Sequence, residues 1–89
     1  MGDRQKPGGK GDFYSHANQF ELSDKVRDKI DKNWDEGKGH FGEARKGLTD
    51  GLVGFLIKCG AGSYMAYRIA NFVAEHHKKH MLYQFTVSV

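Results

Sequence analysis

The stretch LTDGLVGFLIKCGAGSYMAYRIANFVA, residues 48–74, decides the fold prediction. It contains no proline, and about 25 helical residues would span roughly 37 Å, enough to cross the hydrocarbon core of a bilayer. Lys58 and Arg68 interrupt its apolar run, and a lone cation at mid-membrane costs about 2.5–3.5 kcal/mol on insertion scales. From its length and its apolar composition, we predict a single transmembrane helix over residues 48–76.

One face of this predicted helix carries small side chains. At about 100° per residue, several glycines share a face with Lys58, and small residues then recur at spacing four. Such a ladder allows two helix backbones to approach closely in lipid, and an intramembrane charge usually faces protein or water. We therefore expect this face to dock on a larger subunit. The predicted helix-packing interface consists of Gly51, Gly54, Lys58, Gly62, Ala66, Ala70 and Ala74.

The alternative for this segment is an amphipathic helix of a soluble domain, with both cations exposed to water. Apolar or small residues surround most of the helix, however, and a helix that is apolar all round needs burial on all sides. The remainder of the chain offers only one thin apolar stripe to cover it. This comparison favours the membrane span.

An amphipathic surface helix is predicted before the span, over residues 23–36, SDKVRDKIDKNWDE. Ser23 is a good N-cap, because its hydroxyl can accept a hydrogen bond from an orphan backbone N–H. Val26, Ile30 and Trp34 recur every four residues and form one narrow apolar stripe. A stripe of this width suits a helix that lies on a larger body or on a membrane surface.

Two further segments before the span are rich in glycine and charge. Residues 1–22 predict a flexible polar N-terminal segment, since they offer little apolar surface to offset the entropy of ordering. Residues 37–47, GKGHFGEARKG, predict a glycine-rich hinge. A phosphate-binding P-loop is excluded there, because neither its order of glycine and lysine nor a preceding strand is present.

Residues 77–89 predict a basic edge followed by an extended tail. The lysines after the span are typical of a membrane boundary, and the alternating tail MLYQFTVSV has high β-propensity and suits pairing with a partner. His76 and His80 have a spacing that can hold a metal. Without further ligand residues nearby, we predict no metal site.

Length and composition exclude several classes of protein. The chain has 89 residues and a net charge of +3, too short for a pair of Rossmann units or a barrel. Its single cysteine, Cys59, excludes a disulfide scaffold. No catalytic constellation is evident, so we expect no enzyme activity, no cofactor and no small-molecule substrate. The modest charge also predicts no nucleic-acid partner.

The region from Lys25 to His80 resembles cytochrome c oxidase subunit VIIa, a family of small accessory subunits of a respiratory complex. The residues that carry the resemblance are Lys46, Gly47, Asp50, Gly60, Gly62, Tyr64, Tyr67, Lys78 and Lys79. The resemblance implies an all-α, single-pass subunit of the mitochondrial inner membrane, without catalysis, that supports assembly or stability of the respiratory chain. Its partners would be larger membrane subunits and the lipid bilayer.

Two alternatives stay open at this point. An accessory subunit of complex I or of ATP synthase would have the same features as the oxidase subunit. The alternative from a different class is a soluble small helical module that binds a protein or, weakly, a nucleic acid.

Overall fold

Residues 8–88 form helices joined by short turns, with no strand among them. The structure is a computed structural model, which describes residues 8–88 of the chain and the side chains of residues 8–79. The elements in chain order are α1 (Lys10–Ala17), the 3₁₀ turn η2 (Asn18–Phe20), α2 (Asp24–Lys32), α3 (Trp34–Arg45), α4 (Asp50–Lys58) and α5 (Ser63–Ser88).

The segment predicted to form one membrane-spanning helix forms two helices instead. α4 ends at Lys58, and Gly60 follows with a φ of +99°. The amide of Gly60 donates to the carbonyl of Ile57 at 2.9 Å, and the amide of Ala61 donates to the carbonyl of Leu56 at 3.0 Å. These two bonds form a Schellman ending, which stops a helix at a left-handed glycine.

The predicted single-pass arrangement is therefore wrong. Within residues 8–88, no helix combines the length and the apolar character needed to cross a membrane. The turn after α4 folds α5 back against α4, so the apolar faces of the two helices cover each other. Much of the apolar circumference that favoured a span is thus buried inside the protein itself, whereas Leu48, Ile57, Tyr64 and Tyr67 of the same segment are exposed.

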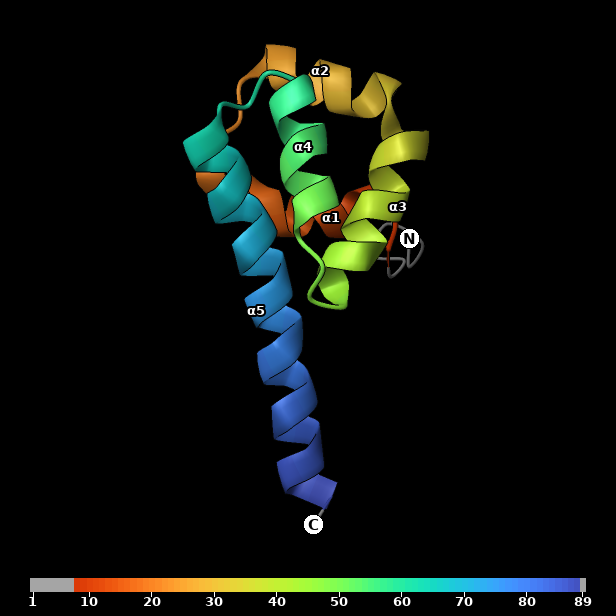
Figure 1. Cartoon of the computed structure of the whole chain (residues 1–89), viewed down its shortest axis with the longest axis vertical. Coiled ribbons are helices and arrows are strands. Elements are labelled where there is room, and N and C mark those ends of the chain that lie inside the picture. Colours follow the sequence, from red (N-terminus) through yellow and green to blue (C-terminus); the bar gives the residue numbers. More distant parts are fainter. Residues whose placement is uncertain (1–7, 89) are drawn as a thin grey trace.

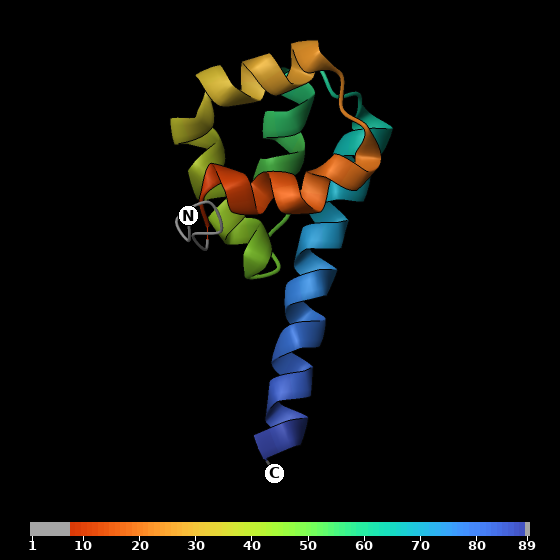
Figure 2. The same cartoon turned by 180° about the vertical axis from the view of Figure 1, so that it is seen from behind.

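The helices form a globule from which α5 projects. α3, α4 and α5 pack against one another, and α1 lies across them (Figures 1 and 2). α2 joins α1 to α3 at the end of the globule opposite the projection (Figure 1). The largest fully buried side chains are Phe13, Phe41, Phe55, Ile30, Leu52, Leu56, Ile69 and Val73.

Two segments predicted to be flexible are helical where the structure describes them. Residues 8–22 contain α1, whose Phe13 is fully buried with its ring centroid 5.5 Å from that of Phe41. Residues 1–7 lie outside the described part. The predicted hinge over residues 37–47 lies almost entirely in α3. Both predictions failed because tertiary burial of a few aromatic rings offsets the ordering entropy that composition alone suggested.

The tail also differs from its prediction. α5 continues to Ser88, so the basic edge and extended tail predicted over residues 77–89 are helical through that residue. Residue 89 lies outside the described part. A segment of high β-propensity gains little stability as a strand when no neighbouring strand pairs with it. Extending α5 avoids the cost of nucleating a new helix, so the tail continues the helix.

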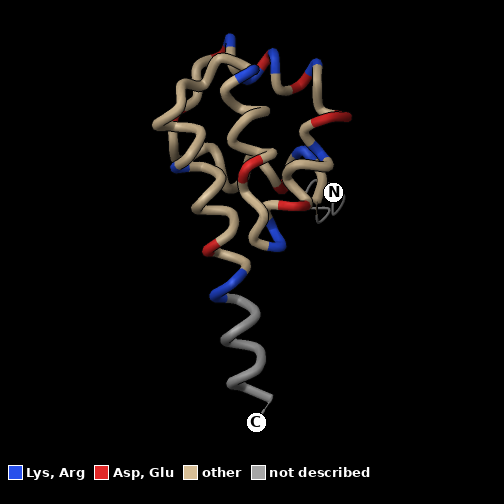
Figure 3. Tube along the Cα trace, viewed as in Figure 1, with Lys and Arg blue, Asp and Glu red and all other residues tan. Residues whose placement is uncertain are grey.

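The helix predicted over residues 23–36 is divided into α2 and the start of α3. The amide of Val26 donates to the hydroxyl of Ser23 at 3.3 Å, which is the predicted cap. Val26 and Ile30 are buried, and Trp34 is half-buried at the first position of α3. The residues of this stripe therefore pack against the core of the protein and do not require a membrane surface. Lys, Arg, Asp and Glu recur along α2 and α3 (Figure 3), and most of these residues are exposed.

Candidate functional site

The predicted helix-packing interface is not one continuous face. Gly62 lies in the turn before α5, with a φ of +77°. Ala66 and Ala70 are fully buried in the core, and Ala74 is half-buried. The small side chains of α5 therefore permit packing within the chain, and these buried alanines offer no docking face to another subunit.

The α4 members of that predicted interface point to different surroundings. Gly51 lies against the ring of His40, whereas a β-carbon at Gly54 would meet nothing within 4 Å. The Lys58 side chain is 63% exposed, and its Nζ lies 3.0 Å from Oε1 of Glu36. Lys58 is thus a surface cation in an exposed ion pair, as the less favoured soluble alternative for this segment expected.

The first candidate site is a patch of aromatic side chains at the start of α5. Tyr64 and Tyr67 are 71% and 55% exposed. Nη1 of Arg68 donates to the hydroxyl of Tyr64 at 2.9 Å. The Arg68 guanidinium also lies over the rings of Phe20 and Tyr64, at 5.5 and 5.6 Å from their centroids. We refer to Phe20, Tyr64, Tyr67 and Arg68 as the tyrosine–arginine patch.

Within the described part of the chain, Arg68 has no carboxylate partner. The hydrogen bond to Tyr64 and the contacts with two rings restrict the motion of this exposed guanidinium. The patch therefore combines two exposed aromatic side chains with a positioned positive charge.

The second candidate site is a contact between α3 and α5. Nδ1 of His77 lies 2.9 Å from the carbonyl oxygen of Val73, so this nitrogen carries the proton and donates it. Nε2 of His77 then accepts a hydrogen bond from Nε of Arg45 at 3.2 Å. Two hydrogen bonds thereby assign the neutral tautomer of His77 and orient the Arg45 guanidinium.

Other imidazole rings surround this contact. His16 is 7% exposed, and its ring is stacked on that of His77 with centroids 5.4 Å apart. The ring centroid of His76 lies 5.0 Å from that of His16. Despite this clustering, no group of three or more His, Cys, Asp or Glu residues within the described residues is arranged to hold a metal ion. The side chain of His80 lies outside the described part.

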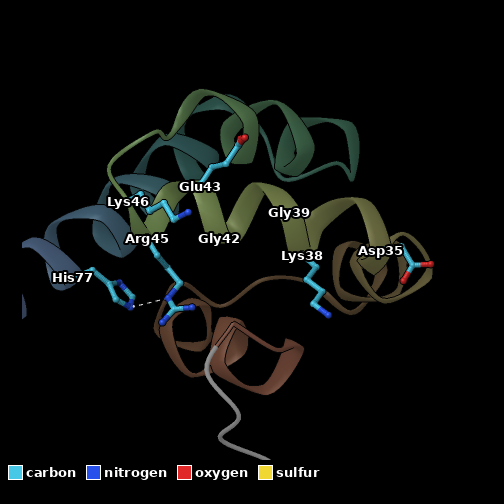
Figure 4. Close-up of a pocket in the computed structure, with 8 residues that line it drawn as sticks. All are labelled: Asp35, Lys38, Gly39, Gly42, Glu43, Arg45, Lys46 and His77. Carbon is cyan, nitrogen blue, oxygen red and sulfur yellow. Dashed lines mark hydrogen bonds between the residues drawn. The ribbon is translucent and has the colours of Figure 1, made fainter.

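A groove of about 780 Å³ runs beside the Arg45–His77 contact. In Figure 4 the side chains of Lys38 and Arg45 extend from the same side of α3, and Gly39 and Gly42 lie between them. A β-carbon at either glycine would meet nothing within 4 Å, so no side chain of residues 8–79 covers this part of the helix. The lining residues are Asp35, Lys38, Gly39, Gly42, Glu43, Arg45, Lys46 and His77.

Two ionisable groups with raised pKa values lie away from both sites, the half-buried Tyr14 and the buried Cys59. Burial raises the pKa of Tyr14, and its hydrogen bond to Oδ1 of Asp31, at 2.9 Å, raises it further. Burial also raises the pKa of the Cys59 thiol. Because the thiolate is the nucleophile, Cys59 is poorly suited to covalent chemistry near neutral pH.

Comparison of the chain with protein-family models, curated proteins and solved structures finds no match. The resemblance to cytochrome c oxidase subunit VIIa therefore stays a prediction, and the membrane span that it implied is wrong for the described residues. The predicted location in the mitochondrial inner membrane also stays a prediction, now without the spanning helix on which it was based.

Neither candidate site was predicted from the sequence. Arg45 and His77 are 32 positions apart, so their contact has no local sequence pattern. Lys38, Gly42 and Arg45 recur at helical spacing and would have indicated one face if their segment had been taken as helix. Tyr64 and Tyr67 entered the sequence analysis only as residues that carry the family resemblance, because their exposure depends on where α5 packs.

Proposed function

We propose that this chain is a small helical module that binds another protein through the tyrosine–arginine patch. The observation that carries the proposal is the pair of exposed tyrosines on one face of α5, with Arg68 held beside them. Tyrosine and arginine are enriched among the residues that dominate binding energy at protein interfaces.

The patch would lose little side-chain conformational entropy when it binds a partner. A tyrosine has few rotatable bonds, so covering Tyr64 and Tyr67 would bury a large area while ordering little. Arg68 is already ordered by its contacts with Phe20 and Tyr64, which reduces the entropy lost on binding. We expect the partner to present an apolar surface with a carboxylate that meets Arg68, since none of the described residues supplies one.

A nucleic-acid partner is the competing function. Bases stack on tyrosine rings, but affinity for nucleic acid comes mainly from several phosphate contacts. The patch contains one cation, Arg68, which is too few to follow a phosphate backbone. Two exposed tyrosines beside a single cation therefore favour a protein partner over a nucleic acid.

Site-specific cross-linking tests the proposal. A photoreactive phenylalanine analogue at position 67 keeps an aromatic ring in the patch, and the same analogue at the exposed Asp28 of α2 serves as control. In cells that naturally express the chain, we expect one protein to be cross-linked from position 67, none from position 28, and loss of the product in an Arg68→Glu variant. Equal products from both positions, or a product that nuclease removes, would contradict the proposal.

A further inference from the structure

Arg45 carries a half-buried positive charge without a carboxylate partner among the described residues. Its Nε donates to His77, and its guanidinium lies 5.9 Å from the ring centroid of Phe41. Its terminal nitrogens, Nη1 and Nη2, donate to no acceptor in the described part of the chain. A β-carbon on Gly8 would lie 3.1 Å from Nη1, so Gly8 approaches this nitrogen from one side. A partly desolvated cation is stabilised by an anion, and the Arg45 guanidinium can therefore accept one as a ligand.

The orientation of that fork is built into the fold. The carbonyl of Val73 determines which nitrogen of His77 carries the proton, and His77 then accepts from Arg45. Stacking of His77 on His16 restricts rotation of the imidazole. The Arg45 guanidinium is therefore positioned before any ligand arrives, which lowers the cost of binding.

We propose that the groove beside Arg45 binds a small molecule carrying a terminal phosphoryl group. Nη1 and Nη2 of Arg45 bind two phosphoryl oxygens side by side, because the planar fork of a guanidinium matches that geometry. Lys38 lines the same groove on the side of α3 that carries Arg45 and supplies a second positive charge (Figure 4). Gly39 and Gly42 leave the surface of α3 open to the remainder of the ligand.

The distribution of charge favours a single phosphoryl group over a long polyanion. Lys38 and Arg45 are seven residues apart, about 10.5 Å along a helix axis, and their long side chains can converge on one group. Asp35 and Glu43 also line the groove, and these carboxylates would repel a phosphate backbone running through it. The inference adds a small-molecule ligand to a chain for which the sequence predicted no small-molecule substrate, and it does not depend on the tyrosine–arginine patch.

Titration of the isotope-labelled full chain with phenyl phosphate, followed by NMR, tests the proposal. We expect saturable shifts of the Gly39 and Gly42 amides and of the Arg45 Nε–H. Arg45→Lys keeps the charge but loses the fork, and should raise Kd roughly tenfold. Lys38→Gln should also weaken binding, whereas Lys58→Gln makes the same charge change outside the groove and should leave Kd unchanged.

The role of His77 as a positioning residue has a separate readout. His77→Phe keeps a ring on His16 but removes the acceptor, and should raise Kd several-fold and speed hydrogen exchange at the Arg45 Nε–H. His77→Gln restores an acceptor and should recover part of both. Circular dichroism establishes that each variant is folded; if His77→Phe does not fold, Arg45→Lys and Lys38→Gln decide the outcome.

Three results would overturn the proposal. The first is a set of shifts that do not saturate or that are spread equally over the lysines of the chain. The second is an Arg45→Lys variant that binds phenyl phosphate as tightly as the wild type. The third is a single-stranded oligonucleotide that binds the groove more tightly than phenyl phosphate, which would indicate a polyanion site.

Discussion

The ring of Phe55 in α4 occupies the place where a β-carbon of residue 37 in α3 would lie. A β-carbon built on Gly37 would be 2.5 Å from Cε2 and Cζ of Phe55, and Phe55 is only 2% exposed. The absence of a side chain at Gly37 therefore allows α3 and α4 to approach. This glycine belongs to a packed helix interface, in a segment whose glycine content predicted a hinge.

Gly37→Ala should destabilise the protein for this reason. Inserting a methyl group into a packed contact costs about 1–3 kcal/mol, which outweighs the gain of about 1 kcal/mol that alanine brings to a helix interior. Urea denaturation measures the change in free energy of unfolding. Gly54→Ala is the matched control, because a β-carbon there meets nothing within 4 Å, and it should stabilise by about 0.5–1 kcal/mol. Equal stabilisation by both substitutions would show that the contact with Phe55 does not exist.

Gly60→Ala distinguishes the observed turn from a continuous helix. At a φ of +99° an alanine is strained, and we expect a loss of about 1–2 kcal/mol in the free energy of unfolding. In a helix running through residue 60 the same substitution would instead gain about 1 kcal/mol. The sign of the change in thermal unfolding midpoint therefore decides between the two arrangements.

Lys58→Leu should have little effect on stability and none on membrane insertion. Lys58 pairs with Glu36 at an exposed position, and such pairs contribute about 0–1 kcal/mol. A double-mutant cycle with Glu36→Gln measures this coupling. In a glycosylation-mapping assay, residues 48–76 should fail to insert with either Lys or Leu at position 58. Efficient insertion of the Leu variant would restore the membrane hypothesis.

The stability of the protein should decrease with rising pH above about 10, where an unperturbed tyrosine titrates. Burial and the bond to Asp31 raise the pKa of Tyr14 in the folded state, so the unfolded chain loses the phenolic proton first. The folded state then holds more protons, so the free energy of unfolding falls. Solvent screening at this half-exposed group keeps the slope below the limit of about 1.4 kcal/mol per pH unit.

Tyr14→Phe isolates that contribution. At neutral pH the variant should be less stable by about 1 kcal/mol, because it loses the hydrogen bond to Asp31. The difference between wild type and variant should shrink as the pH rises above about 10, since only the wild type loses stability through Tyr14. Cys59 also titrates with a raised pKa, but it is present in both proteins and cancels. A constant difference across this pH range would contradict the assignment.

Local features of this protein were readable from its sequence. Ser23 caps α2 because a hydroxyl at that position meets an orphan amide three residues later, whatever the remainder of the chain does. The stripe of Val26 and Ile30 follows from helical periodicity, which marks a buried face without saying what covers it. These interactions span only a few residues, so the sequence determined them by itself.

What covers each apolar face was decided only by the tertiary structure. Hydropathy shows that residues 48–76 need apolar surroundings, but it does not show whether lipid or protein supplies them. The left-handed Gly60 ends α4, and this ending is favourable because α4 and α5 can then bury each other. The same holds for Arg45 and His77, whose contact requires α3 and α5 to be packed first. Burial is non-directional and joins residues far apart in the chain, so sequence pattern predicted that apolar surface must be covered, and packing selected the partner.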